Sequence, residues 1–265
     1  MASSVISQKV LVLGGGGYIG SHFRKAYPGD NFIFLKHSNV KLLQPKFYNQ
    51  IKTILNLSAS KLNASKEDSR SANFNFPKEI LLRISDQPIK WVQAASYYEL
   101  QVPKGRSDYY SIDKVAFRNF LFDSVAEKKQ LAVTSLILPH IFGGTETDSR
   151  IIPTLKKMNN GEVVELGSGN QLLPILHIMD AVRALYQALL SEQLICTPRP
   201  MWHGRLHDLV FNLANSSAAF DRVLFSDVLD KHQEIVLEYP ELLENFSPML
   251  SYEHFVESFK NGDMK

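Results

Sequence analysis

Short apolar runs alternate with amphipathic stretches along the first two-thirds of the chain. Such runs, bounded by polar residues, glycine or proline, are typical of strands buried in a sheet. The predicted strands are Lys9–Leu13, Phe32–Leu35, Thr53–Leu57, Lys90–Ala94 and Ala132–Leu138. Because strands that alternate with helices form repeated βαβ units, the pattern predicts a parallel sheet.

Apolar residues recur at helical spacing in the stretches between these runs. The predicted helices cover Tyr18–Tyr27, Glu67–Ile84 and Ser111–Lys129. In the third helix, Phe117, Phe120 and Leu121 share one face. That face packs on the sheet or forms a subunit contact, so a homodimer is one assembly that we expect.

The pattern loosens after Gly143, which indicates an elaborated carboxyl-terminal half. The predicted elements are a helix at Arg150–Met158, a strand at Glu162–Leu166, a helix at Asp180–Leu190 and a returning strand at Leu209–Leu213. The proline-containing stretch Cys196–His207 is the candidate for a mobile substrate loop.

Together these patterns predict an α/β protein, built as a Rossmann doubly wound parallel sheet with a small carboxyl-terminal substrate lobe. The expected dinucleotide-binding domain covers residues 1–143 and parts of 170–215. The expected substrate lobe covers residues 144–169 and 191–265.

Composition narrows the class of protein further. The 29 basic and 27 acidic residues leave a net charge of +2, unlike the strongly basic surface that duplex nucleic acid demands. Cys196 is the one cysteine, which excludes an internal disulfide and a multi-cysteine metal site and fits a reducing compartment. No segment approaches the roughly 20 apolar residues of a membrane span. We therefore expect a cytoplasmic protein with a small-molecule substrate, and no metal, membrane or nucleic-acid partner.

A glycine-rich segment follows the first predicted strand. KVLVLGGGGYIGSHF places Gly14, Gly17 and Gly20 at G-x-x-G-x-x-G spacing, directly before a predicted helix. Glycine permits a tight turn and close approach of a pyrophosphate, whose charge the helix N-terminus favours. The alternative, a merely flexible glycine run, is disfavoured by the strand and helix on either side.

The segment GGGGYIGSH resembles the opening of the extended short-chain dehydrogenase/reductase family, whose best-known members are NAD-dependent epimerases and dehydratases of nucleotide sugars. The likeness extends from about Lys9 to Asn215. Further matches are Ile54–Ala59 as the fourth strand, Asn73 ahead of the long helix, Tyr110-x-x-x-Lys114, His140–Gly144, and Gly167-x-Gly169 leading to His177–Asp180. The cofactor-binding residues that the resemblance implies are Gly14, Gly17, Tyr18, Ile19, Gly20, Lys36, His37, Leu57, Ser58, Ala59, Asn73, Lys114, Pro139 and His140.

The end of the second predicted strand bears on the choice of cofactor. NAD-using Rossmann proteins commonly place an acidic residue there for the ribose 2′-hydroxyl, but this chain has Lys36. A cation favours the 2′-phosphate of NADP, with His37 and Ser38 as supporting donors. The alternative is a solvated lysine at a strand end. We expect NADP as the cofactor, with NAD as the second choice.

Tyr110 and Lys114 lie one helical turn apart and would face the same groove. A neighbouring ammonium favours the phenolate form of tyrosine, which makes it a proton donor and acceptor nearer neutral pH. In the family mechanism the lysine also reaches the nicotinamide ribose, so the resemblance assigns both residues to catalysis.

The third catalytic residue of the family is a Ser or Thr at the end of the preceding strand, which holds the substrate oxygen. WVQAASYYE offers Ser96, although an alignment on Tyr98 places Ala94 there and leaves the triad incomplete. The expected substrate-binding residues are Ser96, Tyr97, His140 and Arg205, and a structural role is the alternative for His140.

The family's usual cationic clamp for a nucleotide diphosphate is altered in this sequence. Leu173–Pro174 replaces an Arg-Asp pair, and Ile137 stands where an arginine is often found. The cations that can substitute are Arg150, Lys156, Lys157, Arg199 and Arg205.

The residues after Ser96 separate the family's reactions. Dehydrating members carry an acidic pair at that point, whereas this chain has Tyr97 and Tyr98, so a 4,6-dehydratase is disfavoured. Because Lys36 favours NADPH, the expected activity is reduction of a keto-sugar that is linked to a nucleotide. The alternatives are an NAD-dependent nucleotide-sugar epimerase and a catalytically degenerate Rossmann protein that senses its cofactor.

Overall fold

Parallel strands form the central sheet of the computed structural model, which describes residues 6, 8–35, 39, 45–84, 88–127, 130–144, 150–226 and 240–262. These strands are β1 (Val10–Leu13), β2 (Phe32–Leu35), β3 (Thr53–Asn56), β4 (Ile89–Ser96), β5 (Leu131–Leu138) and β9 (Ile195–Cys196). Their order is β2-β1-β3-β4-β5-β9, and each neighbouring pair is parallel. The strands expected in the first half are confirmed, and β9 extends the sheet beyond β5.

The position of β3 marks where the order of strands reverses. β3 is the third described strand along the chain, yet it pairs with the side of β1 opposite to β2. In the common doubly wound order 3-2-1-4-5-6, that place belongs to the fourth strand. The stretch Ile54–Ala59 therefore begins in the strand position that its resemblance implies, at the reversal where doubly wound proteins bind ligands.

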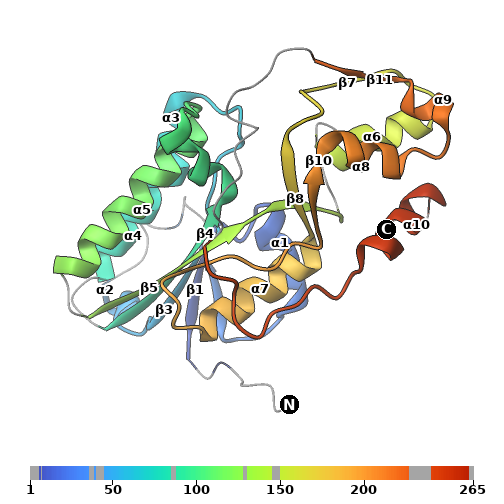
Figure 1. The fold of residues 1–265 in the computed structure, drawn as a ribbon. Helices are drawn as coiled ribbons and strands as arrows, with labels where there is room; N and C mark the ends of the chain where they lie inside the picture. Colours follow the sequence, from blue (N-terminus) through green and yellow to red (C-terminus); the bar gives the residue numbers. More distant parts are fainter. Residues whose placement is uncertain are drawn as a thin grey trace.

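Each face of the sheet has its own core, because side chains alternate along a strand. Val10 and Val12 pack on the face that includes Phe23, whereas Leu11 and Leu13 pack on the opposite face. The helices on the first face are α1 (Tyr18–Ala26) and α7 (Ile178–Leu190), and those on the second are α4 (Phe76–Ile84) and α5 (Tyr109–Glu127). Figure 1 shows helices on both sides of the sheet, which confirms the doubly wound α/β architecture.

The helix expected at Glu67–Ile84 contains a π-helical turn. It is made of α3 (Lys66–Arg70), η2 (Ser71–Asn75) and α4, and it begins where the Ser65 side chain accepts a hydrogen bond from the backbone of Asp68. A π-helical turn adds a residue to one turn and often lies at a functional site. Here it contains Asn73, which is buried.

A third hydrophobic core lies in the carboxyl-terminal part of the chain. The elements around this core are β6 (His140–Phe142), α6 (Ile151–Asn159), β7 (Val164–Leu166), β8 (Leu172–His177), β10 (Trp202–Arg205), α8 (Leu206–Leu213), α9 (Ser217–Phe220), β11 (Val223–Phe225) and α10 (Tyr252–Lys260). Two short helical segments lie elsewhere in the chain, and they are α2 (Pro45–Tyr48) and η3 (Tyr97–Lys104). In Figure 1 the helices α6, α8 and α9 gather beyond one end of the central sheet. The exact division into two domains stays a prediction.

The returning strand expected at Leu209–Leu213 is wrong, because these residues belong to helix α8. The buried side chains of α8 are Leu206, Leu209, Val210 and Leu213. This is the i, i+3, i+4, i+7 spacing of one helical face. The five residues Leu209–Leu213 are too few to show this helical spacing, which begins at Leu206.

The mobile loop expected at Cys196–His207 is also wrong in its main part. Cys196 belongs to β9, and β10 (Trp202–Arg205) pairs antiparallel with β8. Proline does not prevent this pairing, because the prolines of the stretch precede β10 rather than interrupting it.

Asp180 in the first turn of α7 fastens the carboxyl-terminal segment to the central sheet's helical layer. Its carboxylate accepts hydrogen bonds from the backbone N–H of Met249 (3.0 Å) and Leu250 (3.3 Å), and from Arg183 (2.6 Å). The Asp180 side chain is 3% exposed, so these bonds form away from water. The family-like HIMD motif thus supplies a structural anchor. No helix in the described part of the chain is long and apolar enough to cross a membrane.

Candidate active site

The glycine segment turns between β1 and α1 with almost no room for side chains at two positions. Gly14 has a φ of +75°, and a Cβ there would lie 2.6 Å from the backbone of Leu57. A Cβ on Gly20 would lie 2.3 Å from the carbonyl oxygen of Gly14. These two glycines are required by the protein's own backbone.

Gly17 and Gly16 differ from the other two glycines, because the protein leaves space beside them. A Cβ on Gly17 meets only the Gly14 oxygen at 3.4 Å, and one on Gly16 meets nothing within 4 Å. Helix α1 begins after Gly17, which has no side chain to cap the first N–H groups of the helix. This open, N–H-lined turn fits the pyrophosphate of a dinucleotide.

Tyr18 ties the start of α1 to the segment that follows β6. Its hydroxyl donates to the carbonyl of Gly143 (2.5 Å), and the Arg150 guanidinium lies 4.6 Å from its ring centroid. Ile19 is half-buried and packs against the core of the first sheet face. Arg150 is thereby a candidate substitute for the family clamp that contacts the residue directly after the glycine turn.

The loop after β3 is held by buried polar groups. Asn56 accepts hydrogen bonds from both the N–H (3.0 Å) and the hydroxyl (2.6 Å) of Ser58. Farther along, Asn73 accepts from the N–H of Ser60 (3.2 Å) and donates to its hydroxyl (2.9 Å). The loop that includes Leu57, Ser58 and Ala59 therefore keeps one course beside Gly14, and Asn73 acts on it through Ser60.

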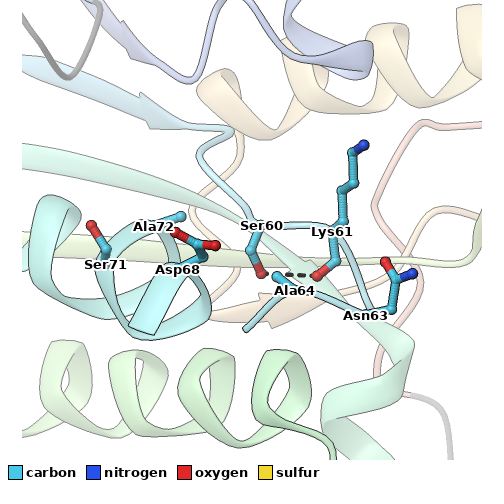
Figure 2. Close-up of a pocket in the computed structure, with 7 residues that line it drawn as sticks. All are labelled: Ser60, Lys61, Asn63, Ala64, Asp68, Ser71 and Ala72. Atoms are coloured by element: carbon cyan, nitrogen blue, oxygen red, sulfur yellow. Dashed lines mark hydrogen bonds between the residues drawn. The ribbon is translucent and has the colours of Figure 1, made fainter. Parts of the chain in front are cut away.

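A cavity of about 400 Å³ opens beside this loop. Figure 2 shows its lining residues, which are Ser60, Lys61, Asn63, Ala64, Asp68, Ser71 and Ala72. The polar lining continues the loop that follows β3 toward α3. The sequence interpretation stopped at Ala59 and missed these residues, although the polar run after ILNLSA was visible.

Ser96, Tyr110 and Lys114 meet at the carboxyl end of β4. The Ser96 side chain interacts with the Tyr110 phenol, and Lys114 Nζ lies 5.8 Å from the centroid of the Tyr110 ring. Lys114 is 4% exposed and donates to the carbonyl of Ala94 (2.9 Å). The structure thus brings the hydroxyl of Ser96, rather than the position of Ala94, to Tyr110.

The protonation of Tyr110 differs from the sequence expectation. Burial raises the pKa of the Tyr110 phenol above its ordinary value, and the hydrogen bond with Ser96 partly offsets the rise. Lys114 points its ammonium at Ala94 O, and burial lowers its pKa. The expected lowering of the tyrosine pKa by the lysine is therefore not seen in the protein alone, because desolvation of the phenolate outweighs it.

Glu99 is a buried carboxylate next to these residues that the sequence interpretation missed. Its Oε1 accepts a hydrogen bond from the backbone N–H of Ser96 (2.9 Å), while the Ser96 hydroxyl accepts from the N–H of Tyr98 (3.3 Å). Together these bonds form a capping box at the start of η3. The S-x-x-E spacing of SYYE carries this signal in the sequence.

His140 begins β6 in contact with both tyrosines that follow Ser96. Its Nε2 contacts the hydroxyls of Tyr97 and, at 3.4 Å, Tyr98. Burial, with help from Arg150 and Arg106, lowers the pKa of His140 to about 3, so the ring is neutral in the physiological range. A neutral imidazole keeps one donor and one acceptor. The three rings and the Arg106 guanidinium, 3.8 Å from the Tyr98 centroid, form one wall next to Ser96.

The other expected site residues that the structure describes are not part of the cluster formed by Ser96, Tyr110 and Lys114. Pro139 is buried between β5 and β6, directly before His140. Arg205 lies on β10 and donates to the Asn170 side chain (3.3 Å), so its contact is within the carboxyl-terminal part. Lys36 and His37 lie outside the described residues, and their proposed contacts stay predictions.

Two features of the described residues bear on what the site can hold. The turn at Gly16 and Gly17 leaves open space in which a dinucleotide pyrophosphate fits. Among these residues, no group of three or more His, Cys, Asp or Glu side chains is placed to hold a metal ion.

Comparison with known proteins gives the family. The family described as "NAD dependent epimerase/dehydratase family" matches residues 10–198. The chain belongs to this epimerase/dehydratase family. The matched range contains the glycine turn, the loop after β3, and the Ser96, Tyr110 and Lys114 cluster. No curated protein sequence matches the chain.

Solved structures share the fold of this epimerase/dehydratase at low sequence identity. UDP-glucose 4-epimerase from Thermotoga maritima, with UDP-glucose, has a TM-score of 0.77 and 15% identity, covering 96% of this chain and 98% of that one. A dTDP-glucose 4,6-dehydratase from Streptomyces venezuelae, with NAD and TYD bound, has a TM-score of 0.72 and 17% identity, with 96% of each chain covered. RMD from Pseudomonas aeruginosa, complexed with NADPH, has a TM-score of 0.69 and 12% identity, covering 96% and 98%.

Family and fold together confirm the resemblance seen in the sequence. The protein is a nicotinamide-dependent enzyme of the extended short-chain dehydrogenase/reductase type. Which of the two nicotinamide cofactors it prefers, and which reaction it performs, are matters for proposal.

Proposed function

We propose that this protein is a nucleotide-sugar epimerase, which inverts one hydroxyl-bearing carbon of the sugar. The observation that carries the proposal is the cluster of Ser96, Tyr110 and the buried Lys114 at the carboxyl end of β4, where Lys114 Nζ lies 5.8 Å from the centroid of the Tyr110 ring. Membership of the epimerase/dehydratase family favours this reaction over the keto-sugar reductase that the sequence expectation placed first. The case for the reductase depended on one residue of the sequence, Lys36.

The side chains have distinct tasks in this reaction. Tyr110 takes the hydroxyl proton as the carbonyl forms and returns it on the reverse step, while Ser96 hydrogen-bonds the same oxygen. The dinucleotide, held by Gly14–Gly20 and the loop Leu57–Ala59, supplies reversible hydride transfer when bound. Lys114 supplies a positive charge near Tyr110 that acts against the rise in the Tyr110 pKa caused by burial.

The wall formed by Tyr97, Tyr98 and His140 supports inversion over dehydration. A dehydratase needs an acid and a base immediately after Ser96, and both positions are occupied by tyrosines that contact His140. These aromatic faces and the neutral imidazole can bind a sugar ring through apolar contact and hydrogen bonds. We assign the sugar to this wall and the diphosphate to Arg150, with Arg205 as a further candidate.

The first experiment incubates the purified protein with UDP- and dTDP-hexoses and follows the anomeric and C4 protons by NMR. An epimerase yields the inverted sugar with no net change in cofactor absorbance. A reductase instead consumes one NADPH for each keto-sugar reduced, and that result in the absence of any inversion overturns the proposal. Neither reaction with any substrate, but retained cofactor, places the cofactor-sensing alternative first.

The cofactor preference and the assembly are separate proposals. We infer NADP from Lys36, with His37 in support, and NAD as the alternative. Mass spectrometry of the nucleotide released on denaturation identifies the cofactor directly, and release of NAD alone rejects the inference from Lys36. A homodimer stays a prediction that sedimentation equilibrium measures. The face of α5 that carries Phe117 and Leu121 is buried in the protein's own core, so it is not a subunit contact.

A further inference from the structure

Glu99 has no assigned role in the reaction, yet its carboxylate interacts electrostatically with both Tyr110 and Lys114. It lies on η3, directly after the β4 strand end, and is 1% exposed. Burying a carboxylate costs free energy unless it is paired and hydrogen-bonded. The buried Glu99 carboxylate must therefore be stabilised by partners within the protein rather than by water.

The two oxygens of Glu99 have different partners. Oε1 accepts the Ser96 backbone N–H at 2.9 Å, which fixes the residue whose hydroxyl meets Tyr110. Oε2 lies 3.4 Å from the Arg118 guanidinium but accepts no hydrogen bond from the residues that the structure describes. One oxygen thus fixes backbone geometry, and the other contributes mainly charge.

The charges that face Glu99 come from one side of α5. Tyr110, Lys114 and Arg118 are spaced four residues apart, so they line one face of the helix. Lys114 is buried, and burial lowers the pKa of its ammonium while Glu99 opposes that fall. Burial in turn raises the pKa of Glu99, with Lys114, Arg118 and the Ser96 hydrogen bond acting against the rise.

We propose that Glu99 is a positioning residue of the active site: its carboxylate holds the Ser96 backbone in place and supplies the buried negative charge that balances the ammonium of Lys114. The proposal deepens the proposed function and rests on it, since it assigns Glu99 to the same proton-transfer site. Glu99 touches neither substrate nor cofactor in this role, and acts through Ser96 and Lys114.

The sign of the pH effect follows from the charges. An amide in Glu99→Gln keeps an oxygen to accept the Ser96 N–H but removes the negative charge. Lys114 then loses the group that raises its pKa, and Tyr110 loses a neighbour that raises its pKa too. Lys114 deprotonates at lower pH and Tyr110 ionises at lower pH, so the whole kcat/KM profile moves toward acid, by about one pH unit.

The test compares Glu99→Gln with Glu79→Gln, which removes an exposed glutamate that pairs with Arg83 on α4. We expect the acid-ward shift of the kcat/KM profile in Glu99→Gln and no shift in Glu79→Gln. Glu99→Ala, which also frees the Ser96 N–H, should lower kcat at least about tenfold more than Glu99→Gln. Equal profiles for wild type and Glu99→Gln overturn the charge role, and equal kcat for Gln and Ala variants overturns the backbone role.

A readout without turnover separates this proposal from the proposed function. NMR titration of ¹⁵Nζ-labelled lysines, with Lys114→Arg to assign the signal, reports the protonation of Lys114 directly. Its midpoint should fall in Glu99→Gln even if no nucleotide sugar is turned over, and an unchanged midpoint rejects the proposal. If the single variant does not fold, Glu99→Gln/Arg118→Met leaves no unpaired Arg118 and is expected to show the same fall.

Discussion

Tyr110 interacts with Ser96, and the buried Lys114 lies with its Nζ 5.8 Å from the Tyr110 ring centroid. Tyr110→Phe removes one oxygen, so the fold and cofactor binding should persist while the chemical step slows by about 10²–10⁴-fold. Single-turnover rates measure the step, and cofactor titration measures binding. Tyr109→Phe is the matched control, because Tyr109 is the 49% exposed neighbour on the same helix.

Ser96→Ala belongs to the same experiment and should also slow the chemical step, since no other hydroxyl is seen bonded to Tyr110 among the described residues. The alternative alignment, which places Ala94 at the triad position, expects little loss. A Tyr110→Phe enzyme that keeps the wild-type rate would remove the proposed proton transfer and, with it, the role of Ser96.

Among the elements, the turn between β1 and α1 makes the sharpest prediction about the cofactor. Gly17→Val should fold, because the added Cβ meets only the Gly14 oxygen at 3.4 Å. Its side chain should nevertheless obstruct the pyrophosphate and cost about 1.5–3 kcal/mol of charge-assisted hydrogen bonding, roughly ten- to a hundred-fold in Kd. Isothermal titration with NAD and NADP measures the change.

The control for the turn is Gly29→Val, because a Cβ on Gly29 meets nothing within 4 Å and Gly29 lies between α1 and β2, away from the turn. It should bind both cofactors like the wild type. If Gly17→Val is folded and binds as tightly as Gly29→Val, the dinucleotide lies elsewhere.

Elements could be predicted where the range considered contained the whole repeat of apolar positions. Features that depend on contacts between distant residues could not be predicted. β1 and α1 followed from VLVL and the glycine turn, whereas α8 was missed because five residues do not contain its i, i+7 spacing. The π-helical turn at Asn73 leaves no mark in apolar periodicity. In the site, Tyr110 and Lys114 share one helix, so their spacing was readable, but the lysine's contact with Ala94 crosses from α5 to β4 and needed the fold.

At the scale of the whole molecule, Asp180 links the central sheet's helices to the carboxyl-terminal segment. Asp180→Ala leaves the N–H groups of Met249 and Leu250 without their acceptor and should lower the free energy of unfolding by about 3 kcal/mol. Urea denaturation measures the loss. Asp208→Ala is the matched control, because Asp208 also lies in the first turn of a helix but its side chain is 60% exposed. Equal stability of the two variants would contradict the anchoring role.

The hydrogen bonds between Asp180 and the Met249–Leu250 backbone constrain the amino acid at position 180 more than the amino acids at positions 249 and 250. Asp180 binds peptide N–H groups, which every residue except proline provides, and the Met249 side chain is left 76% exposed. Position 249 can therefore vary through almost any residue over evolution with the link intact, whereas a proline there would remove the Met249 hydrogen bond and leave only that of Leu250. The carboxylate at position 180 has no such latitude, so lineages of this enzyme should vary at one end of the link and stay constant at the other.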